Sequence, residues 1–224
     1  MKKKDDLFIE FLLKWFKTNK RKFSWRILNL TPFQVLMAEL LLQKTNANQV
    51  EKIFPDFIKK FPDPSKIVKT DESQLAETLR PLGLFLRRSR DLKKTAKLII
   101  DNNNEVPETK KDLMNLPGVG EYIANAVLCF AFNKPVPIID ANVGRIMKRV
   151  YSFPVKNAPS RDKNLEKFMQ DLIPKSNFKE FNLALLDLAA LICLPKNPKC
   201  LECPVSKICD FFINLNKNNI NKNE

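Results

Sequence analysis

The sequence has 224 residues, with 39 Lys and Arg against 25 Asp and Glu, no histidine and only four glycines. This length supports a sizeable core without disulfides, and the scarcity of glycine argues against an all-β design built on tight turns. The net charge of +14 suits a protein that binds a polyanion, although a soluble protein of a lysine-rich proteome would carry it too, and without histidine any acid–base chemistry would fall to carboxylates, Tyr, Lys or Cys.

The apolar stretches of the chain do not predict export or membrane insertion. Residues 7–16 are interrupted by Glu10 and Lys14 at helical spacing, unlike the apolar core of a signal peptide. Residues 181–194 are too short to span a bilayer, which needs about 20 residues, and contain Asp187. We therefore expect a cytoplasmic protein with no membrane role.

Helical periodicity begins at the N-terminus. Apolar residues recur three and four apart within residues 7–16, which predicts an amphipathic first helix. Thr31 followed by Pro32 predicts an N-cap and a first helical position, and the apolar pattern of residues 50–57 predicts the next helix.

Capping and charge signals indicate helices further along the chain. Asp71 and Gln74 have the spacing of a capping box. A basic run over residues 87–97 shares its predicted helix with an apolar face, and an Asn-rich turn at residues 102–104 ends it. Residues 214–224, rich in Asn and Lys, predict a disordered tail. Further helices are expected near residues 109–116, 121–132, 142–151, 162–172 and 178–192, with no convincing strand pair.

Two of the four glycines fall in the sequence Leu116-Pro117-Gly118-Val119-Gly120, between two helical patterns. Glycines there indicate a tight turn in which the backbone comes close to another group. The free amides at the start of the following helix, together with its dipole, would form a site for a DNA phosphate. A plain helix–helix turn is the alternative.

Asp140 lies 20 residues after Gly120, behind an apolar run over residues 135–139 and in front of a predicted helix. Taken alone, an Asp at this position is most often an N-cap. Because Asp140 follows the hairpin, we also consider a catalytic role for its carboxylate.

These motifs resemble those of the endonuclease III superfamily, the helix-hairpin-helix DNA glycosylases. The matching residues are 116–120, then 138–143 and Arg145 at the family's spacing, and the resemblance extends from residues 39–45 through the final cysteines. It covers nearly the whole chain. The resemblance implies a DNA repair enzyme of base excision repair, nucleoid-associated if the source is prokaryotic.

The fold that this resemblance implies is all-α and has two domains. A six-helix barrel domain with the hairpin would span residues 27–133. An iron-sulfur cluster domain would combine residues 1–26 and 134–213, with the disordered tail after it.

The resemblance also implies catalytic roles. Asp140 matches the essential carboxylate that assists breakage of the bond between deoxyribose and base, and Asn142 matches a residue that orients it. Members with lyase activity place a nucleophilic lysine two positions after the second hairpin glycine, where this chain has Tyr122. Because a phenol cannot form a Schiff base, we expect a monofunctional N-glycosylase with little or no lyase activity.

Four cysteines near the C-terminus have the spacing C-x6-C-x2-C-x5-C. Paired C-x2-C units would suggest zinc, but only one is present, so zinc is a minor alternative. The resemblance implies a [4Fe-4S] cluster with these four thiolates, and Cys129 is most simply a core thiol. The expected cluster ligands are Cys193, Cys200, Cys203 and Cys209.

Double-stranded DNA containing a mismatched or deaminated base is the partner that the resemblance implies, bound by a monomer. Gln43 is the candidate for filling the gap that a flipped base leaves in the duplex. The residues expected to contact DNA are Gln43, Leu116, Gly118, Val119, Gly120, Arg145, Lys196 and Lys199.

Two branches of the superfamily combine an acidic residue matching Glu39 with a tyrosine matching Tyr122: one removes thymine or uracil opposite guanine, the other adenine opposite oxidised guanine. Glu39 would position or protonate the flipped base, unless it is only a solvated helix residue. Ala141, between Asp140 and Asn142, and the short segment after the last cysteine favour thymine or uracil, whereas Gln43 resembles the adenine branch. The other alternative is a noncatalytic iron-sulfur protein that binds DNA.

Overall fold

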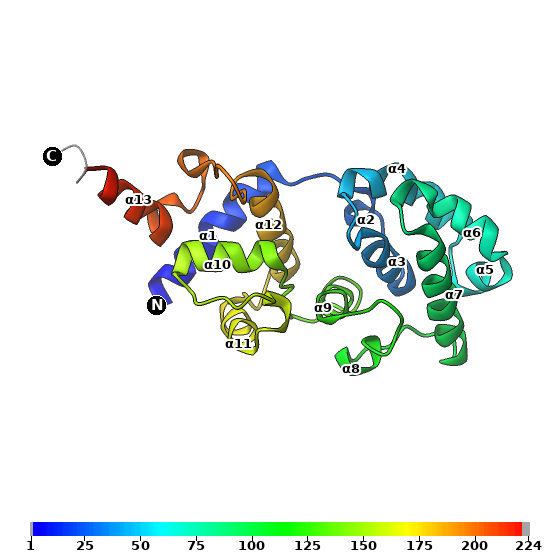
Figure 1. The fold of residues 1–224 in the computed structure, drawn as a ribbon. Helices are drawn as coiled ribbons and strands as arrows, with labels where there is room; N and C mark the ends of the chain where they lie inside the picture. The colour runs from blue at the N-terminus through cyan, green and yellow to red at the C-terminus, as the bar shows by residue number, and fades with distance from the viewer. Residues whose placement is uncertain (1, 221–224) are drawn as a thin grey trace. The chain divides into compact units, whose positions relative to one another are not determined.

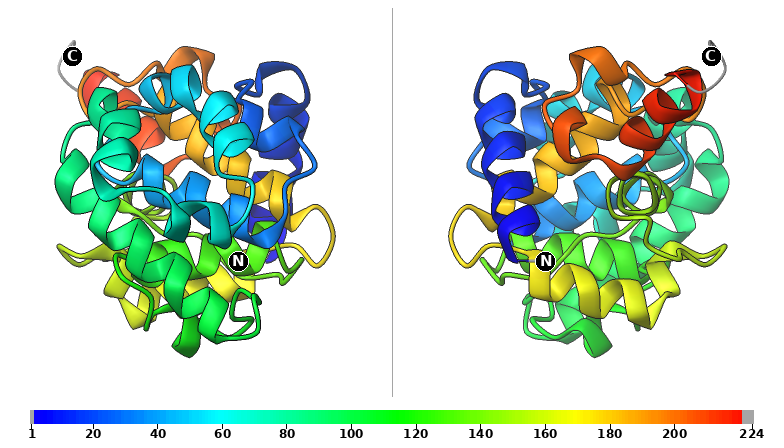
Figure 2. Two further views of the ribbon diagram at one scale, coloured as in Figure 1. Left: turned by 90° about the vertical axis from the view of Figure 1, so that its right-hand side faces the viewer. Right: turned by 90° about the vertical axis from the view of Figure 1, so that its left-hand side faces the viewer.

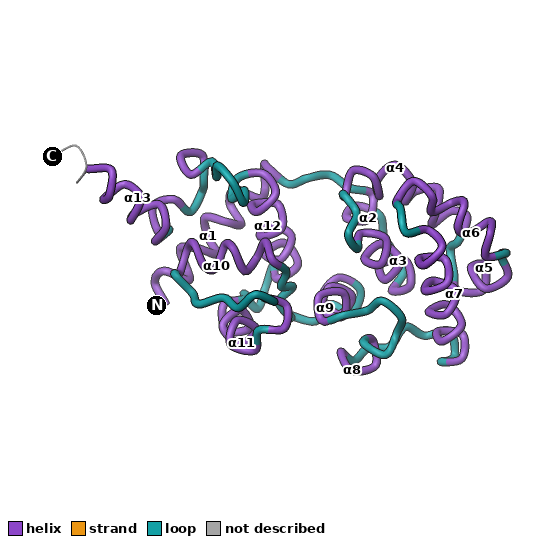
Figure 3. The backbone as a smooth tube through the Cα atoms, viewed as in Figure 1, coloured by secondary structure: helices purple, strands orange, loops and turns teal. Residues whose placement is uncertain are grey.

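The structure is a computed structural model that describes residues 2–220, and within that range it is helical, without a strand (Figures 1 and 3). The chain forms two compact units. Unit 2 is the continuous stretch Lys22–Lys134, and unit 1 combines Met1–Arg21 with Pro135–Glu224. The all-α, two-part architecture predicted from the sequence is confirmed. No helix in the described range is long and apolar enough to cross a membrane.

Unit 2 contains the helices from α2 to α9. The buried helix α3 contacts α4 and α9, and α7 packs against α5 and α6. The bounds are α2 (Ser24–Ile27), α3 (Pro32–Leu42), α4 (Ala47–Lys60), α5 (Pro64–Lys69), α6 (Glu72–Leu79), α7 (Phe85–Asp101), α8 (Lys110–Leu113) and α9 (Glu121–Phe130).

Unit 1 joins the two ends of the chain. Helix α1 (Lys2–Asn19) packs against α12 (Phe178–Leu191), and the two lie side by side in Figures 1 and 2. Phe8, Leu12 and Phe16 of α1 belong to one buried core with α10, α11 and α12. The remaining helices are α10 (Ala141–Tyr151), α11 (Lys163–Leu172) and α13 (Asp210–Ile220).

A buried carboxylate anchors the segment that leaves α1. The side chain of Asp187 on α12 is completely buried and accepts hydrogen bonds from the backbone N–H of Arg21 at 2.9 Å and from its Nε at 2.6 Å. Charge-assisted bonds of this kind offset the desolvation of a buried carboxylate. The end of the N-terminal segment is therefore tied to the C-terminal half of unit 1.

The capping signals gave one correct and one incorrect prediction. Thr31 caps α3 as expected: its hydroxyl accepts from Gln34 N at 3.3 Å and Gln34 Oε1 accepts from Thr31 N at 3.1 Å, which is a complete capping box. Asp71 precedes α6, but its side chain makes no capping hydrogen bond. The capping box predicted there is wrong, although the helix itself begins where expected.

Three of the predicted boundaries differ from those in the structure. Residues 22–26 lie in unit 2 and not with the cluster domain, because Ser24 donates from N and Oγ to Glu51 Oε2, both at 2.9 Å, and Trp25 packs edge-on against Phe54. The boundary predicted between residues 133 and 134 falls between Lys134 and Pro135 in the structure. The tail predicted as disordered from residue 214 is helical through Ile220 as part of α13, and residues 221–224 lie outside the described residues.

Candidate active site

Asp140 of unit 1 is the N-cap of α10. Its Oδ1 accepts from Val143 N at 2.8 Å, so the structural role expected of an Asp before a helix is present. Its Oδ2 accepts from Asn142 Nδ2 at 2.7 Å. One oxygen thus caps the helix, while the amide of Asn142 fixes the orientation of the other.

Arg145 connects this pair to the cysteine-bearing loop. Its Nη1 donates to Asn142 Oδ1 at 2.9 Å, its Nε to Cys193 O at 2.9 Å and its Nη2 to Ala189 O at 3.2 Å. Because all these donors belong to one rigid guanidinium, the orientation of Asn142 is coupled to the backbone of the loop. Arg145 was predicted as a DNA contact; the structure gives its side chain these intramolecular partners.

The same loop is held by Arg149, one turn further along α10. The guanidinium donates to Leu194 O at 2.7 Å, Pro195 O at 3.0 Å and Cys193 Sγ at 3.3 Å. Sequence reasoning did not single out Arg149, because its position in a basic helix carried no sign of these carbonyl partners. Lys196 and Lys199, in the loop itself, are exposed, as a phosphate-contacting role requires.

The four predicted cluster ligands, Cys193, Cys200, Cys203 and Cys209, line one apolar cavity, together with Ile146, Leu188 and Phe212 among others. All are free thiols. Burial raises the pKa of Cys203 to about 12 and raises those of Cys200 and Cys209, so an added cation would be needed to favour the thiolates. As they stand, no three or more Cys, Asp or Glu side chains in residues 2–220 are arranged to hold a metal ion.

The glycine-rich hairpin of unit 2 joins α8 to α9. Gly118 has φ +79°, a left-handed conformation that favours glycine, and Val119 N donates to Leu116 O at 3.1 Å to close the turn. Gly120 is the N-cap of α9, and no side chain makes a capping hydrogen bond there. The hairpin thus places a helix N-terminus without a side-chain cap directly after the turn, a geometry that suits an incoming phosphate.

Gln43, at the C-cap of α3, contacts this hairpin. Its Nε2 donates to Gly118 O at 2.6 Å, and a Cβ built on Gly118 would lie 3.6 Å from Gln43 Oε1 and 3.4 Å from Leu40 Cδ2. The Gln43 side chain is otherwise exposed. Two residues predicted separately as DNA contacts are therefore neighbours, although 75 positions separate them in the sequence.

Glu39 lies on α3, in a run of residues that are all buried from Val35 to Leu41. It is 6% exposed, and its Oε2 has no hydrogen-bond partner. Burial raises its pKa to about 7, and the nearby charge of Arg26 partly opposes this. The reading of Glu39 as a solvated helix residue is therefore excluded.

Tyr122 occupies the second position of α9 and is half-buried, directly after the hairpin. It shares unit 2 with Glu39, Gln43 and residues 116–120, whereas Asp140, Asn142, Arg145 and the cysteine loop belong to unit 1. Direct contacts join Gln43 to Gly118 in unit 2, and in unit 1 they join Asp140 to Asn142 and Arg145 to Asn142 and the cysteine loop.

Comparisons with known proteins identify the family of the chain. A family model described as the HhH-GPD superfamily base excision DNA repair protein matches residues 37–175, which include the hairpin, Asp140 and Arg145. A thymine/uracil-DNA glycosylase of Methanothermobacter thermautotrophicus is 36% identical over 94% of this chain and 95% of its own length. An adenine DNA glycosylase of Mycobacterium tuberculosis is 35% identical, over 87% of this chain and 64% of its own. The solved structure of a thermostable thymine-DNA glycosylase superposes with a TM-score of 0.90 at 34% identity, covering 95% of this chain and 98% of that one.

Proposed function

Because this chain belongs to the HhH-GPD superfamily of base excision DNA repair proteins, we propose that it is a monofunctional glycosylase that hydrolyses the bond between deoxyribose and a thymine or uracil opposite guanine. The observation that carries the proposal is the Asp140–Asn142 pair, in which one carboxylate oxygen is held at 2.7 Å by an amide. The protein would act as a monomer on double-stranded DNA.

Departure of the base leaves positive charge on the sugar. An ionised Asp140 stabilises that charge and directs the attacking water. Asn142 donates to Asp140 Oδ2 and Arg145 holds Asn142, so the carboxylate does not need to reorient as the charge develops. Such preorganisation is where most of the rate enhancement of an electrostatic site originates.

Glu39 and Tyr122 would recognise the flipped base in unit 2. With a pKa of about 7, Glu39 is protonated in a large fraction of molecules at neutral pH and can donate a proton or hydrogen bond to a carbonyl oxygen of a pyrimidine. Tyr122, in place of a lysine, gives the protein no Schiff-base nucleophile at that position. Sodium borohydride trapping in good yield on a DNA substrate would contradict the monofunctional assignment.

The hairpin and the cysteine loop would bind the DNA backbone. The N-terminus of α9, which has no side-chain cap, would present its positive dipole end to a phosphate, and Lys196 and Lys199 offer exposed ammonium groups. Binding of this kind weakens steeply as salt concentration rises, because condensed counterions are released from the DNA. Gln43 would fill the gap left by the flipped base. Gln43→Ala should then weaken mismatch binding more than the chemistry at an already unpaired base.

Thymine or uracil is preferred to adenine because the thymine/uracil relative matches along nearly the whole of both chains and because Ala141 stands between Asp140 and Asn142. Gln43 favours the adenine alternative, and the excision test described next distinguishes the two.

The test is single-turnover excision on matched duplexes containing T:G, U:G, A:G, adenine opposite 8-oxoguanine, or no mismatch, followed by alkaline cleavage of the abasic product. Product from T:G and U:G supports the proposal, and product from adenine strands alone makes the protein an adenine glycosylase.

Asp140→Asn separates catalysis from binding. Asn caps a helix about as well as Asp, so α10 should persist, while excision falls about 1000-fold and mismatch binding remains. Asp63→Asn is the matched control, since Asp63 caps α5 by accepting from Lys66 N at 3.0 Å and should leave the rate unchanged. If wild type excises nothing and binds DNA, the protein is a noncatalytic DNA-binding protein instead.

We also propose that Cys193, Cys200, Cys203 and Cys209 hold a [4Fe-4S] cluster. Support comes from the chemistry of the donor set: four free thiols line one apolar cavity, and the guanidinium of Arg149 donates to one of the sulfurs. When bound, the cluster would cross-link the loop that presents Lys196 and Lys199. Iron and sulfide analysis should give about four of each per chain, and one zinc ion per chain with no iron would contradict the proposal.

A further inference from the structure

Arg88 of α7 differs from the other members of its basic run. Arg87 and Arg90 are exposed, whereas Arg88 is 9% exposed. Its partners are oxygen atoms of neighbouring backbone and one hydroxyl. Nε donates to Gly83 O at 3.0 Å, Nη1 to Leu40 O at 3.0 Å and Leu41 O at 3.4 Å, and Nη2 to Gln43 O and Thr45 Oγ1, both at 2.6 Å.

Most of these oxygens belong to the C-terminal end of α3. The last carbonyls of a helix have no intrahelical partner and form the negative end of its dipole, so a buried cation there is well placed. The chain then turns through Lys44 with φ +52°, where a glycine would ordinarily stand. Arg88 therefore donates hydrogen bonds to the last carbonyls of α3. In a C-terminal glycine motif, the backbone N–H groups that follow the helix fill this role.

The end of α3 is also where Gln43 reaches the hairpin. Its side chain donates to Gly118 O at 2.6 Å, while its own carbonyl accepts from Arg88 at 2.6 Å. Gln43, Arg88 and Gly118 line one small cavity together with Leu40 and Leu92. A displacement of the α3 terminus would therefore move both the Gln43 side chain and its contact with the hairpin.

We propose that Arg88 is a positioning residue for Gln43: its guanidinium fixes the last turn of α3 and thereby sets where the Gln43 side chain enters the duplex. The inference rests on the proposed function of Gln43 in filling the gap behind a flipped base. Arg88 itself is assigned no contact with DNA. A lysine in its place would keep the charge but not the planar set of donors that several oxygens share.

A double-mutant cycle tests the proposal. Arg88→Met and Gln43→Ala should each lower single-turnover excision from a T:G duplex by about tenfold, the effect of losing a strong hydrogen bond. The double variant should be no slower than the slower single variant, because both changes disable the same side chain. Arg88→Lys should restore part of the rate. Arg90→Met, which removes an equal charge from the exposed face of α7, should stay within about twofold of wild type.

Hydrogen exchange of the DNA-free protein gives a readout that needs no activity. Arg88→Met should speed exchange in the last turn of α3 and at Val119 N, which donates to Leu116 O in the hairpin. Gln43→Ala should speed exchange in the hairpin alone. If Arg88→Met does not fold, Arg88→Lys replaces it in both experiments.

Losses that multiply in the double variant, or unchanged exchange in the hairpin of the Arg88 variant, would overturn the positioning role. A wild-type protein that excises no base would overturn the proposed function instead, while exchange in the hairpin would still report whether Arg88 positions Gln43.

Discussion

Replacing Glu39 by Gln should make the protein more stable relative to wild type as the pH is raised. Burial raises the pKa of Glu39 from 4.5 to about 7, so the folded state holds this proton over a pH range in which the unfolded chain has lost it. Folding therefore binds a proton between about pH 4.5 and pH 7, and the stability of the wild type falls as pH rises through that window. Gln has no proton to lose and escapes this penalty.

The magnitude follows from the two pKa values. The difference between these pKa values lowers the unfolding free energy of the wild type by about 3 kcal/mol above pH 7. At pH 5 the same effect lowers it by only about 1 kcal/mol. The stability difference between Glu39→Gln and wild type should therefore grow by about 2 kcal/mol from pH 5 to pH 8. Urea unfolding followed by circular dichroism at the two pH values measures it directly.

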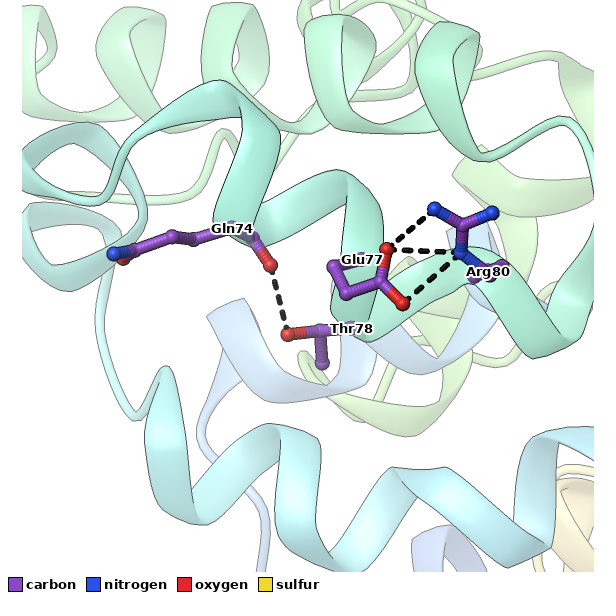
Figure 4. Close-up of polar contacts among 4 residues, drawn as sticks. All are labelled: Gln74, Glu77, Thr78 and Arg80. Atoms are coloured by element: carbon purple, nitrogen blue, oxygen red, sulfur yellow. Dashed lines mark hydrogen bonds and ion pairs between the residues drawn. The ribbon is translucent and has the colours of Figure 1, made fainter.

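Glu77 offers a control of opposite sign. Its exposed carboxylate is bonded by Arg80 at 2.6 to 3.0 Å (Figure 4), and these hydrogen bonds lower its pKa. Glu77→Gln should therefore lose a small stabilisation that is present at neutral pH and disappears as the pH falls through the lowered pKa. A Glu39→Gln difference that stayed constant from pH 5 to pH 8 would refute the assignment of a buried carboxyl whose charged form is penalised.

Three further variants test the packing and polar contacts of unit 1. Gly144→Ala would place a Cβ 2.9 Å from a proline ring, so we expect a loss of about 1–3 kcal/mol, measured by thermal unfolding. Asp187→Asn removes a buried charge from its bonds to Arg21 and should lower stability by about 3 kcal/mol, whereas an unchanged Tm would contradict the anchoring role. Arg145→Met frees Asn142 and should slow T:G excision about tenfold with little change in mismatch affinity, and equal losses in both would assign Arg145 to binding.

The sequence predicted the helices whose start signals and periodicity agree. Thr31 and Pro32 located the first turn of α3 to the residue, because a capping hydroxyl and a fixed φ act locally. The C-terminal helix α13 was missed because its polar composition resembles a disordered segment. Its first turn, however, is anchored from a distance, since Asp210 accepts from Lys4 Nζ at 2.6 Å. Such a contact between the two ends of the chain has no local signal.

Motif spacing identified the candidate site residues, but it did not identify the groups that contact them. Glu39 was weighed as a solvated residue, and only tertiary packing shows that it is buried with an unpaired oxygen. Arg88 was read as one member of a basic run. Arg88 lies four residues before Leu92 and eight before Ala96, a spacing that places it on the buried face of α7. The periodicity therefore indicated its burial, but its charge favoured an exposed position.

The construction of unit 1 from both ends of the chain has a consequence for the order of events during synthesis. Helix α1 is synthesised before its partner α12, which ends at residue 191. At roughly 5–20 residues per second, α1 waits about 10–35 seconds before that partner exists. In the meantime unit 2 is complete and free to fold, while Phe8, Leu12 and Phe16 remain without their core. We expect the apolar face of α1 to stay exposed on the nascent chain until α12 has been made, so chaperone dependence should follow that face more closely than the predicted catalytic residues.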